Sequence, residues 1–123
     1  MLKFISYISL LFILSVRLYA DNLQAPVNAI YDTINSRYLI TQTNNQLVAL
    51  DKEMQNAETL LTLNSPAELY THYNKLYIAD MNIILEYNIE NMQELSRHEL
   101  NTQIKIKTIT GDGNDNLYFV NAN

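Results

Sequence analysis

The chain has 123 residues, no cysteine and no tryptophan, and it carries 13 acidic against eight basic side chains. The absence of cysteine excludes disulfides and cysteine-ligated metal sites. Two of the basic side chains, Lys3 and Arg17, and none of the acidic ones precede Asp21, so positions 21–123 have a formal charge of −7. An acidic domain repels phosphate backbones, which argues against a nucleic-acid partner.

Residues 1–20 have the pattern of a secretory signal peptide. Lys3 supplies a positive start, residues 4–16 are apolar apart from Ser and Tyr, and Ala20 offers a small residue at the cut. This apolar run is shorter than the roughly 20 residues of a membrane-spanning helix. We therefore expect cleavage after Ala20, release to the periplasm or the exterior, and no stable membrane span in the mature chain. The alternative is an uncleaved membrane anchor.

The remaining sequence predicts short strands joined by polar turns. After a polar lead-in that ends at Pro26, segments rich in β-branched and apolar residues alternate with clusters of Asn, Ser and Thr. The strands expected in the first unit are 27–34, 37–42, 46–51 and 59–63. In the second unit they are 67–73, 76–80, 83–88 and 95–100, and a third unit opens with 103–110 and 116–120. Segments 54–61 and 91–100 contain helix formers, so a short helix is the alternative at each.

The units repeat with a regular period. Leu76 follows Tyr38 by 38 positions, and Leu117 follows Leu76 by 41. A period of about 40 residues is the length of a four-stranded propeller blade. The second strand of the second unit is apolar on both faces, with Leu76 and Ile78 on one and Tyr77 and Ala79 on the other, as expected when sheets stack face to face about 10 Å apart. The predicted organisation is a blade at 26–65, a blade at 66–102 and a half blade at 103–123.

The residues of these units resemble the YVTN/WD40-like β-propeller family. The motif is carried by Tyr38-Leu39-Ile40-Thr41 followed by residues 47–51, and by Tyr77-Ile78-Ala79-Asp80 followed by residues 84–88. Residues 112–121 are similar to the repeats of NHL and YWTD propellers. The resemblance implies an all-β fold of antiparallel four-stranded blades. Closed rings have about four to eight blades, so we expect this chain to be an N-terminal fragment; the alternative is a partial propeller that self-associates through its open edge.

The strongest candidate metal ligands are Asp112, Asn114 and Asn116. They stand at positions 1, 3 and 5 of a calcium-loop pattern, where oxygen ligands converge on a cation. Leu117 occupies the position that requires Gly, and Asn123 the position that requires Glu. A turn between two strands explains the same residues and is the favoured interpretation.

Other polar residues are weaker candidates. His72 and His98 fall in different strands of the second unit without a matching carboxylate pattern, so structural or solvated roles are favoured over a metal pair. The resemblance to propeller hydrolases and lactonases offers Asp32, Glu68 and Asp80 as ligands of a divalent cation. The favoured interpretation is that they are hydrated residues of loops or of the channel mouth, and Asp32 and Glu68 do not occupy corresponding places in their units.

Seven tyrosines follow Ala20. They could form a surface that binds sugar or a protein partner, since tyrosine combines a large apolar ring with a polar tip. Most of them stand at strand positions that recur between units, so packing between sheets is the favoured interpretation.

The resemblance implies a non-catalytic exported propeller that binds proteins as a scaffold or assembly factor, without a cofactor. The alternative is a fragment of a metal-dependent hydrolase or lactonase. A propeller with a quinone cofactor would need Trp-rich motifs, and the chain has no Trp.

Overall fold

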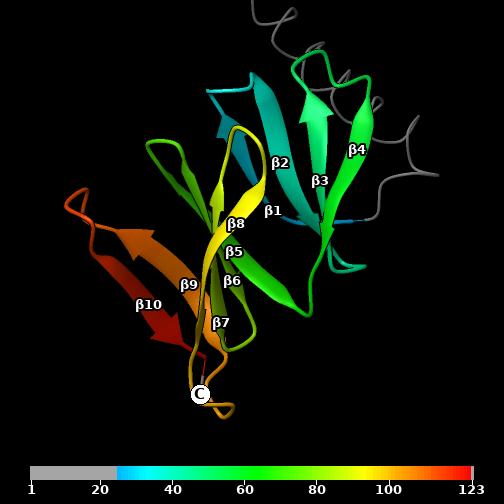
Figure 1. Ribbon diagram of the computed structural model, residues 1–123. Coiled ribbons are helices and arrows are strands. Elements are labelled where there is room, and N and C mark those ends of the chain that lie inside the picture. Colours follow the sequence, from blue (N-terminus) through cyan, green and yellow to red (C-terminus); the bar gives the residue numbers. More distant parts are fainter. Residues whose placement is uncertain (1–24, 123) are drawn as a thin grey trace, which may run out of the picture.

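The computed structural model describes residues 25–122 of the chain, and the expected signal peptide lies outside the described residues (Figure 1). The elements between Ala25 and Ala122 are all strands. They are β1 Pro26–Asp32, β2 Arg37–Gln42, β3 Gln46–Asp51, β4 Ala57–Thr62, β5 Pro66–His72, β6 Lys75–Asp80, β7 Ile83–Asn88, β8 Gln93–Glu99, β9 Ile106–Gly111 and β10 Leu117–Asn121. Within these residues there is no helix long and apolar enough to cross a membrane.

The strands form three sheets in chain order. Strands β1 to β4 make a four-stranded sheet, β5 to β8 make a second one, and β9 pairs with β10. Every pairing is antiparallel. The first strands of the sheets, β1, β5 and β9, lie next to one another (Figure 1). The expected all-β fold with four-stranded antiparallel sheets is therefore confirmed.

The outer strands expected at 59–63 and 95–100 are confirmed as β4 and β8, although each begins two residues earlier than expected. The alternative of a short helix at 54–61 and at 91–100 is therefore wrong. The expected strand 103–110 begins only at Ile106, because Asn101 organises a turn ahead of it. The Asn101 carbonyl accepts from the Ile104 amide (2.9 Å), and its side chain accepts from the Gln103 amide (3.0 Å).

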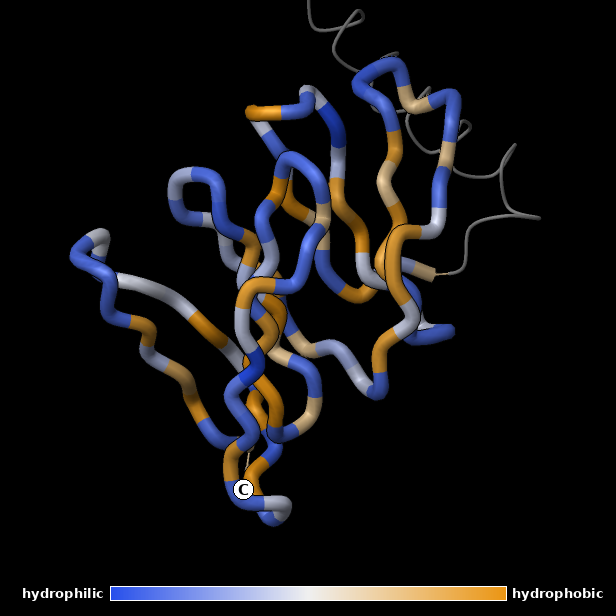
Figure 2. Tube along the Cα trace, viewed as in Figure 1, coloured by the Kyte–Doolittle hydropathy of each residue, from blue (hydrophilic) through white to orange (hydrophobic). Residues whose placement is uncertain are grey.

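The core lies in two layers on either face of β6. Leu76 and Ile78 are fully buried in the layer between the first and second sheets. Ala79 is buried in the layer between the second sheet and the β9–β10 pair, beside Ile106 and Ile109. Figure 2 shows the hydrophobic stretches running through the strands and the hydrophilic residues gathering at most of the turns. The prediction that both faces of this strand are covered is confirmed.

Several turns need a left-handed backbone. Asn45, between β2 and β3, has φ 66°, a conformation that Asn tolerates well. Tyr73 (φ 53°) and Met81 (φ 59°) adopt similar values in the tight turns of the second sheet. Bulky side chains at positive φ are unfavourable, and the backbone of Met81 is held there by hydrogen bonds to Ser65 (3.2 Å) and Ile106 (2.8 Å).

Candidate functional site

Each first strand contains one extra residue close to its start. The pairing of β1 with β2 skips Val27, that of β5 with β6 skips Ala67, and that of β9 with β10 skips Lys107. The three positions are evenly spaced along the sequence, at the period of the repeat. A bulge leaves its extra residue out of the ladder and re-aims the side chain, and bulges are frequent beside functional sites. The three sheets therefore carry the same irregularity at the same place.

The residue after each bulge connects neighbouring sheets. The Asn28 side chain accepts a hydrogen bond from the backbone amide of Leu69 (3.2 Å). The Glu68 carboxylate accepts from the amide of Ile109 (3.1 Å) and from the Thr108 hydroxyl. Asn28, Glu68 and Thr108 follow the bulges at equivalent positions, so two of the three join the sheet that contains them to the next one.

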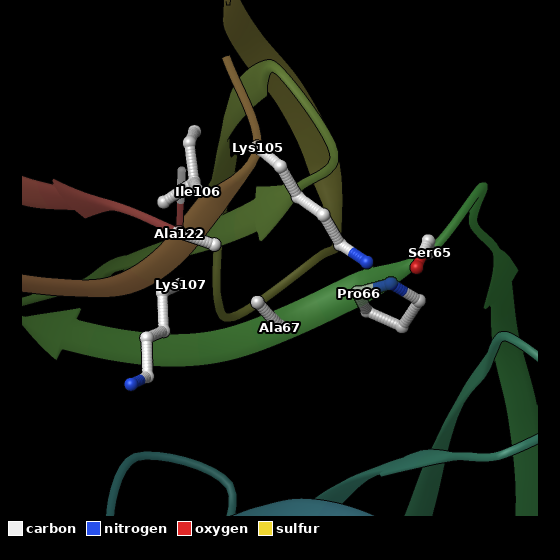
Figure 3. A pocket seen from close by; sticks show the side chains of 7 residues that line it. All are labelled: Ser65, Pro66, Ala67, Lys105, Ile106, Lys107 and Ala122. Carbon is white, nitrogen blue, oxygen red and sulfur yellow. The ribbon is translucent and has the colours of Figure 1, made fainter.

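A hollow lies where the second and third sheets begin. It is lined by Ser65–Ala67, by Lys105–Lys107 and by Ala122, and its volume is about 420 Å³. We call it the inner-strand pocket. Figure 3 shows that its walls come from the start of β5 and from the segment that leads into β9. Two of the bulge residues, Ala67 and Lys107, belong to this pocket.

Asp80 fixes the linker that leads into β5. This carboxylate is buried and accepts from the backbone amides of Asn64 (2.9 Å) and Ser65 (2.6 Å). Gln42 takes the equivalent place in the first sheet, since it pairs with Pro26 as Asp80 pairs with Pro66. Gln42 is also buried, and its amide has no hydrogen-bond partner among residues 25–122. The expectation that Asp80 is a hydrated residue is therefore wrong, because its side chain is buried and holds the linker between the first two sheets in the described part of the chain.

Asp32 belongs to a buried polar cluster at the far end of β1. Its carboxylate lies 2.9 Å from Arg37 Nε and also accepts from the side-chain amide of Asn35 (2.8 Å). Both Asn35 and Arg37 then donate to the backbone carbonyl of Ile89, at 2.9 and 3.1 Å. The cluster fastens the β1–β2 turn to the second sheet. The expectation that Asp32 is hydrated is therefore wrong, because its side chain is fully buried.

Asp112 organises the β9–β10 turn. It accepts from the amide of Asn114 (2.7 Å) and from the side-chain amide of Asn116 (2.8 Å). These hydrogen bonds, the one from Asn116 most of all, lower the pKa of Asp112. The arrangement has the geometry of an Asx turn, and the Asn116 side chain presents its N–H to the carboxylate. Asn123, at the position where a calcium loop requires Glu, lies outside the described residues.

The remaining candidates are dispersed. His72 lies at the end of β5 against the ring of Tyr73 (4.2 Å between centroids), whereas His98 lies on β8 close to Ser96. Asp32, Glu68 and Asp80 each bind different groups. Among residues 25–122 no three His, Asp or Glu side chains lie close enough together to hold a metal ion.

Three exposed apolar side chains gather at the turns of the first two sheets. Tyr31, Ile34 and Tyr73 are exposed by 43%, 42% and 81%. All three line one shallow hollow of about 80 Å³, beside Thr71 and Ile89. We call this surface the hairpin-tip face. The expectation that tyrosines pack between sheets holds for Tyr87, which is buried, and is wrong for the exposed Tyr31, Tyr73 and Tyr118.

Comparisons with known proteins address the fold. No protein-family model matches the chain, and a search of curated proteins finds no relative. The structure is similar to the crystal structure of Sqt1 from Saccharomyces cerevisiae, with a TM-score of 0.64 and 10% identity, over 78% of this chain and 28% of that one. It is also similar to the extracellular domain of BT4673 from B. thetaiotaomicron, with a TM-score of 0.63 and 12% identity, over 85% of this chain and 14% of that one. Both match as β-propellers.

The chain has the fold of part of a β-propeller. Apo AztD from Citrobacter koseri is a further match, with a TM-score of 0.50 and 13% identity, over 63% of this chain and 24% of that one. The chain spans less than a third of the length of each of these three proteins. Its sheets are therefore blades, with β1, β5 and β9 as their inner strands.

Some features shared by the blades could not be recognised from the sequence. Asn28 and the three bulge residues were missed, although their even spacing along the chain was available as a signal. The equivalence of Asn28 and Glu68 was not recognised, because Glu68 was compared with Asp32, whereas its counterpart in the first blade is Asn28. The bulges themselves depend on strand register, which the pattern of apolar residues does not give.

The second blade holds an ion pair beside the third one. Lys75 Nζ lies 2.9 Å from Glu86 Oε1, and the Ser96 hydroxyl donates to Glu86 Oε2 (2.7 Å). Lys75 and Glu86 line an open groove of about 570 Å³ together with Tyr77, Ile84 and residues of the β9–β10 pair. The hydrogen bond from Lys75 is the main reason why the pKa of Glu86 is lowered, and it likewise raises the pKa of Lys75.

We expect Glu86→Gln to reduce the sensitivity of the fold to acid. Because the pKa of Glu86 is lower in the folded chain, its stabilising contribution is complete above the unfolded value of about 4.3 and disappears as the pH falls through the folded value. At pH 7 the variant should lose about 0.5–1 kcal/mol, as expected for a partly exposed pair. Denaturant unfolding between pH 7 and pH 2.5 measures both effects. Glu53→Gln, in an exposed pair, is the control, and equal acid profiles for Glu86→Gln and the parent would contradict the prediction.

Proposed function

We propose that the chain is an exported, non-catalytic propeller domain that binds a protein partner through the hairpin-tip face, as a scaffold or assembly factor. In this proposal its strands belong to the YVTN-type repeats. Export is supported by the pattern of residues 1–20. The observation that carries the binding function is the grouping of three exposed apolar side chains, Tyr31, Ile34 and Tyr73, around one hollow.

The conformation of Tyr73 supports a role beyond folding. It stands in a two-residue turn at positive φ, where Gly, Asn or Asp is favoured. A residue held in an unfavourable backbone region is a reason to suspect function. Tyrosine supplies a large contact area with a polar tip and is enriched in protein interfaces. The turn thus presents an aromatic ring to solvent at a position where Gly, Asn or Asp is the usual residue.

The carboxylates do not favour the alternative of a metal-dependent hydrolase. Such an enzyme needs several oxygen ligands aimed at one cation. Glu68 instead binds groups of the third blade, Asp80 binds the linker between blades, and Asp32 pairs with Arg37. Since these contacts already engage the carboxylates in three separate places, protein binding is the better-supported function.

Site-specific photo-crosslinking in the native cell tests the proposal. A photoreactive residue at position 34 of the full chain should capture one defined protein, and Tyr73→Gly should abolish that adduct. Tyr73→Gly relieves the unfavourable φ but makes the unfolded chain more flexible, so its free energy of unfolding should stay within about 1 kcal/mol of the parent.

The control places the photoreactive residue at position 95. Leu95 is exposed by 49% on the outer strand β8 and does not line the hollow of the hairpin-tip face. The proposal is wrong if position 95 gives the same adduct as position 34, if neither gives one, or if Tyr73→Gly leaves the adduct unchanged.

A further inference from the structure

Two lysines next to the start of β9 differ from the other basic side chains of the described residues. Arg37, Lys52, Lys75 and Arg97 each lie within 4.0 Å of a carboxylate. Between Ala25 and Ala122, neither Lys105 nor Lys107 has such a partner, although these residues contain twice as many acidic as basic side chains. Two unpaired cations at one place in an acidic chain call for a physical explanation.

Both lysines line the inner-strand pocket. In Figure 3 the Lys105 side chain is directed toward Ser65 and Pro66, whereas the Lys107 side chain lies on the other side of Ala67 and extends away from Ser65. The hydroxyl of Ser65 adds a third donor. The other lining residues, among them Pro66 and Ile106, offer apolar side chains.

The backbone positions the Cα atoms of both lysines. Lys105 is held on both sides, because its amide donates to the Asn121 side chain (3.2 Å) and its carbonyl accepts from the Ala122 amide (2.8 Å). Lys107 is the bulge residue of the third blade, so its side chain leaves the regular ladder. The corresponding bulge residues, Val27 and Ala67, are apolar. The positive charge is thus a property of the third inner strand and does not follow from the repeat.

We propose that the inner-strand pocket binds a small anionic molecule through a carboxylate or phosphate group. Ammonium and hydroxyl donors make strong charge-assisted hydrogen bonds to such oxygens. A volume of about 420 Å³ falls within the range of sites for small organic ligands, so the ligand is larger than a simple ion. The pocket lies where the inner strands begin, whereas the turns of the hairpin-tip face follow their ends. The two sites are therefore separate, and one can fail without the other.

Titration of the full chain with inorganic phosphate and, separately, with succinate tests the proposal. Both are followed by amide chemical shifts in 150 mM salt. We expect saturable shifts at Ser65, Ala67 and Lys107 with one of the probes. Lys105→Gln and Lys107→Gln should each weaken binding about tenfold, because each removes one charged donor. Lys52→Gln removes a charge from the exposed β3–β4 turn and should leave binding unchanged.

The two probes distinguish between a phosphorylated ligand and a carboxylic acid as the source of the anionic group. Tighter binding of phosphate assigns a phosphorylated ligand, and tighter binding of succinate assigns a carboxylic acid, provided that both lysines are needed. The proposal is overturned if the shifts do not saturate with either probe, if they fall outside the pocket, or if Lys52→Gln weakens binding as much as the pocket variants do. Thermal melting of the three variants should match the parent, since all three lysines are exposed.

Discussion

Asp32→Ala is expected to lower the free energy of unfolding by about 3–5 kcal/mol, the cost of removing one member of a buried ion pair. The side chain of Asp32 is fully buried and that of Arg37 is exposed by 18%. The substitution leaves a nearly buried guanidinium without its carboxylate. It also removes the acceptor for the backbone amides of Ile34 (3.0 Å) and Asn35 (3.2 Å), which fix the β1–β2 turn. Urea unfolding followed by circular dichroism measures the loss.

The exposed ion pair between Lys52 and Glu53 supplies the matched control. Its atoms are 3.9 Å apart and its side chains are exposed by 63% and 55%. Glu53→Ala should therefore cost less than about 0.5 kcal/mol. A loss in Asp32→Ala no larger than that of this control would mean that the cluster does not join the first blade to the second, and that the turn is held by packing alone.

Strands that are buried on both faces could be predicted from the sequence, because most of their residues are apolar. β6 and β7 are apolar on both faces, because the second sheet lies between two core layers, and this pattern is visible without a structure. β2 and β3 show the same pattern in the sequence. The outer strands β4 and β8 carry no such pattern. Helix formers in segments 54–61 and 91–100 therefore allow a helix as well as a strand, and only the strand pairing in the structure distinguishes the two.

The polar contacts between blades could not be predicted in this way. Asn28 is an ordinary polar residue in a strand, and only the position of Leu69 in the next blade gives it a partner. Asp32 looks like a hydrated turn residue in the sequence, and its burial depends on contacts of its cluster with Ile89 in the second blade. Exposure of Tyr31 and Tyr73 is likewise a property of where the hairpins end relative to their neighbours. Strand propensity is local, whereas these contacts are set by how the blades stack.

Glu68→Ala is expected to release the third blade while the first two remain folded. The pair β9–β10 has no third or fourth strand among the described residues, and Glu68 is its polar connection to β5. Removing the carboxylate leaves the Ile109 amide and the Thr108 hydroxyl without their acceptor. A hydrogen bond to a charged group contributes about 1.5–3 kcal/mol, so amide exchange in β9 and β10 should accelerate by about tenfold to a hundredfold.

Hydrogen exchange of single amides distinguishes local opening from global unfolding. Amides of β2 and β3, in the first core, should keep the protection of the parent. Glu68→Gln retains an acceptor oxygen of the same reach, so it should accelerate exchange in β9 far less than Glu68→Ala does. Asn28→Ala removes the equivalent contact between the first two blades, where a much larger apolar core also acts, and its effect should be about 1 kcal/mol.

The third blade is the place where this contact matters most. Its apolar layer against the second blade has only four fully packed members, Ala79, Ile84, Ile106 and Ile109, whereas ten buried residues join the first two blades. If all strands of Glu68→Ala exchange faster together, the third blade does not open by itself and the apolar layer holds it. If none does, the carboxylate contributes nothing, and the equivalence of Asn28, Glu68 and Thr108 reflects the repeat and not its stability.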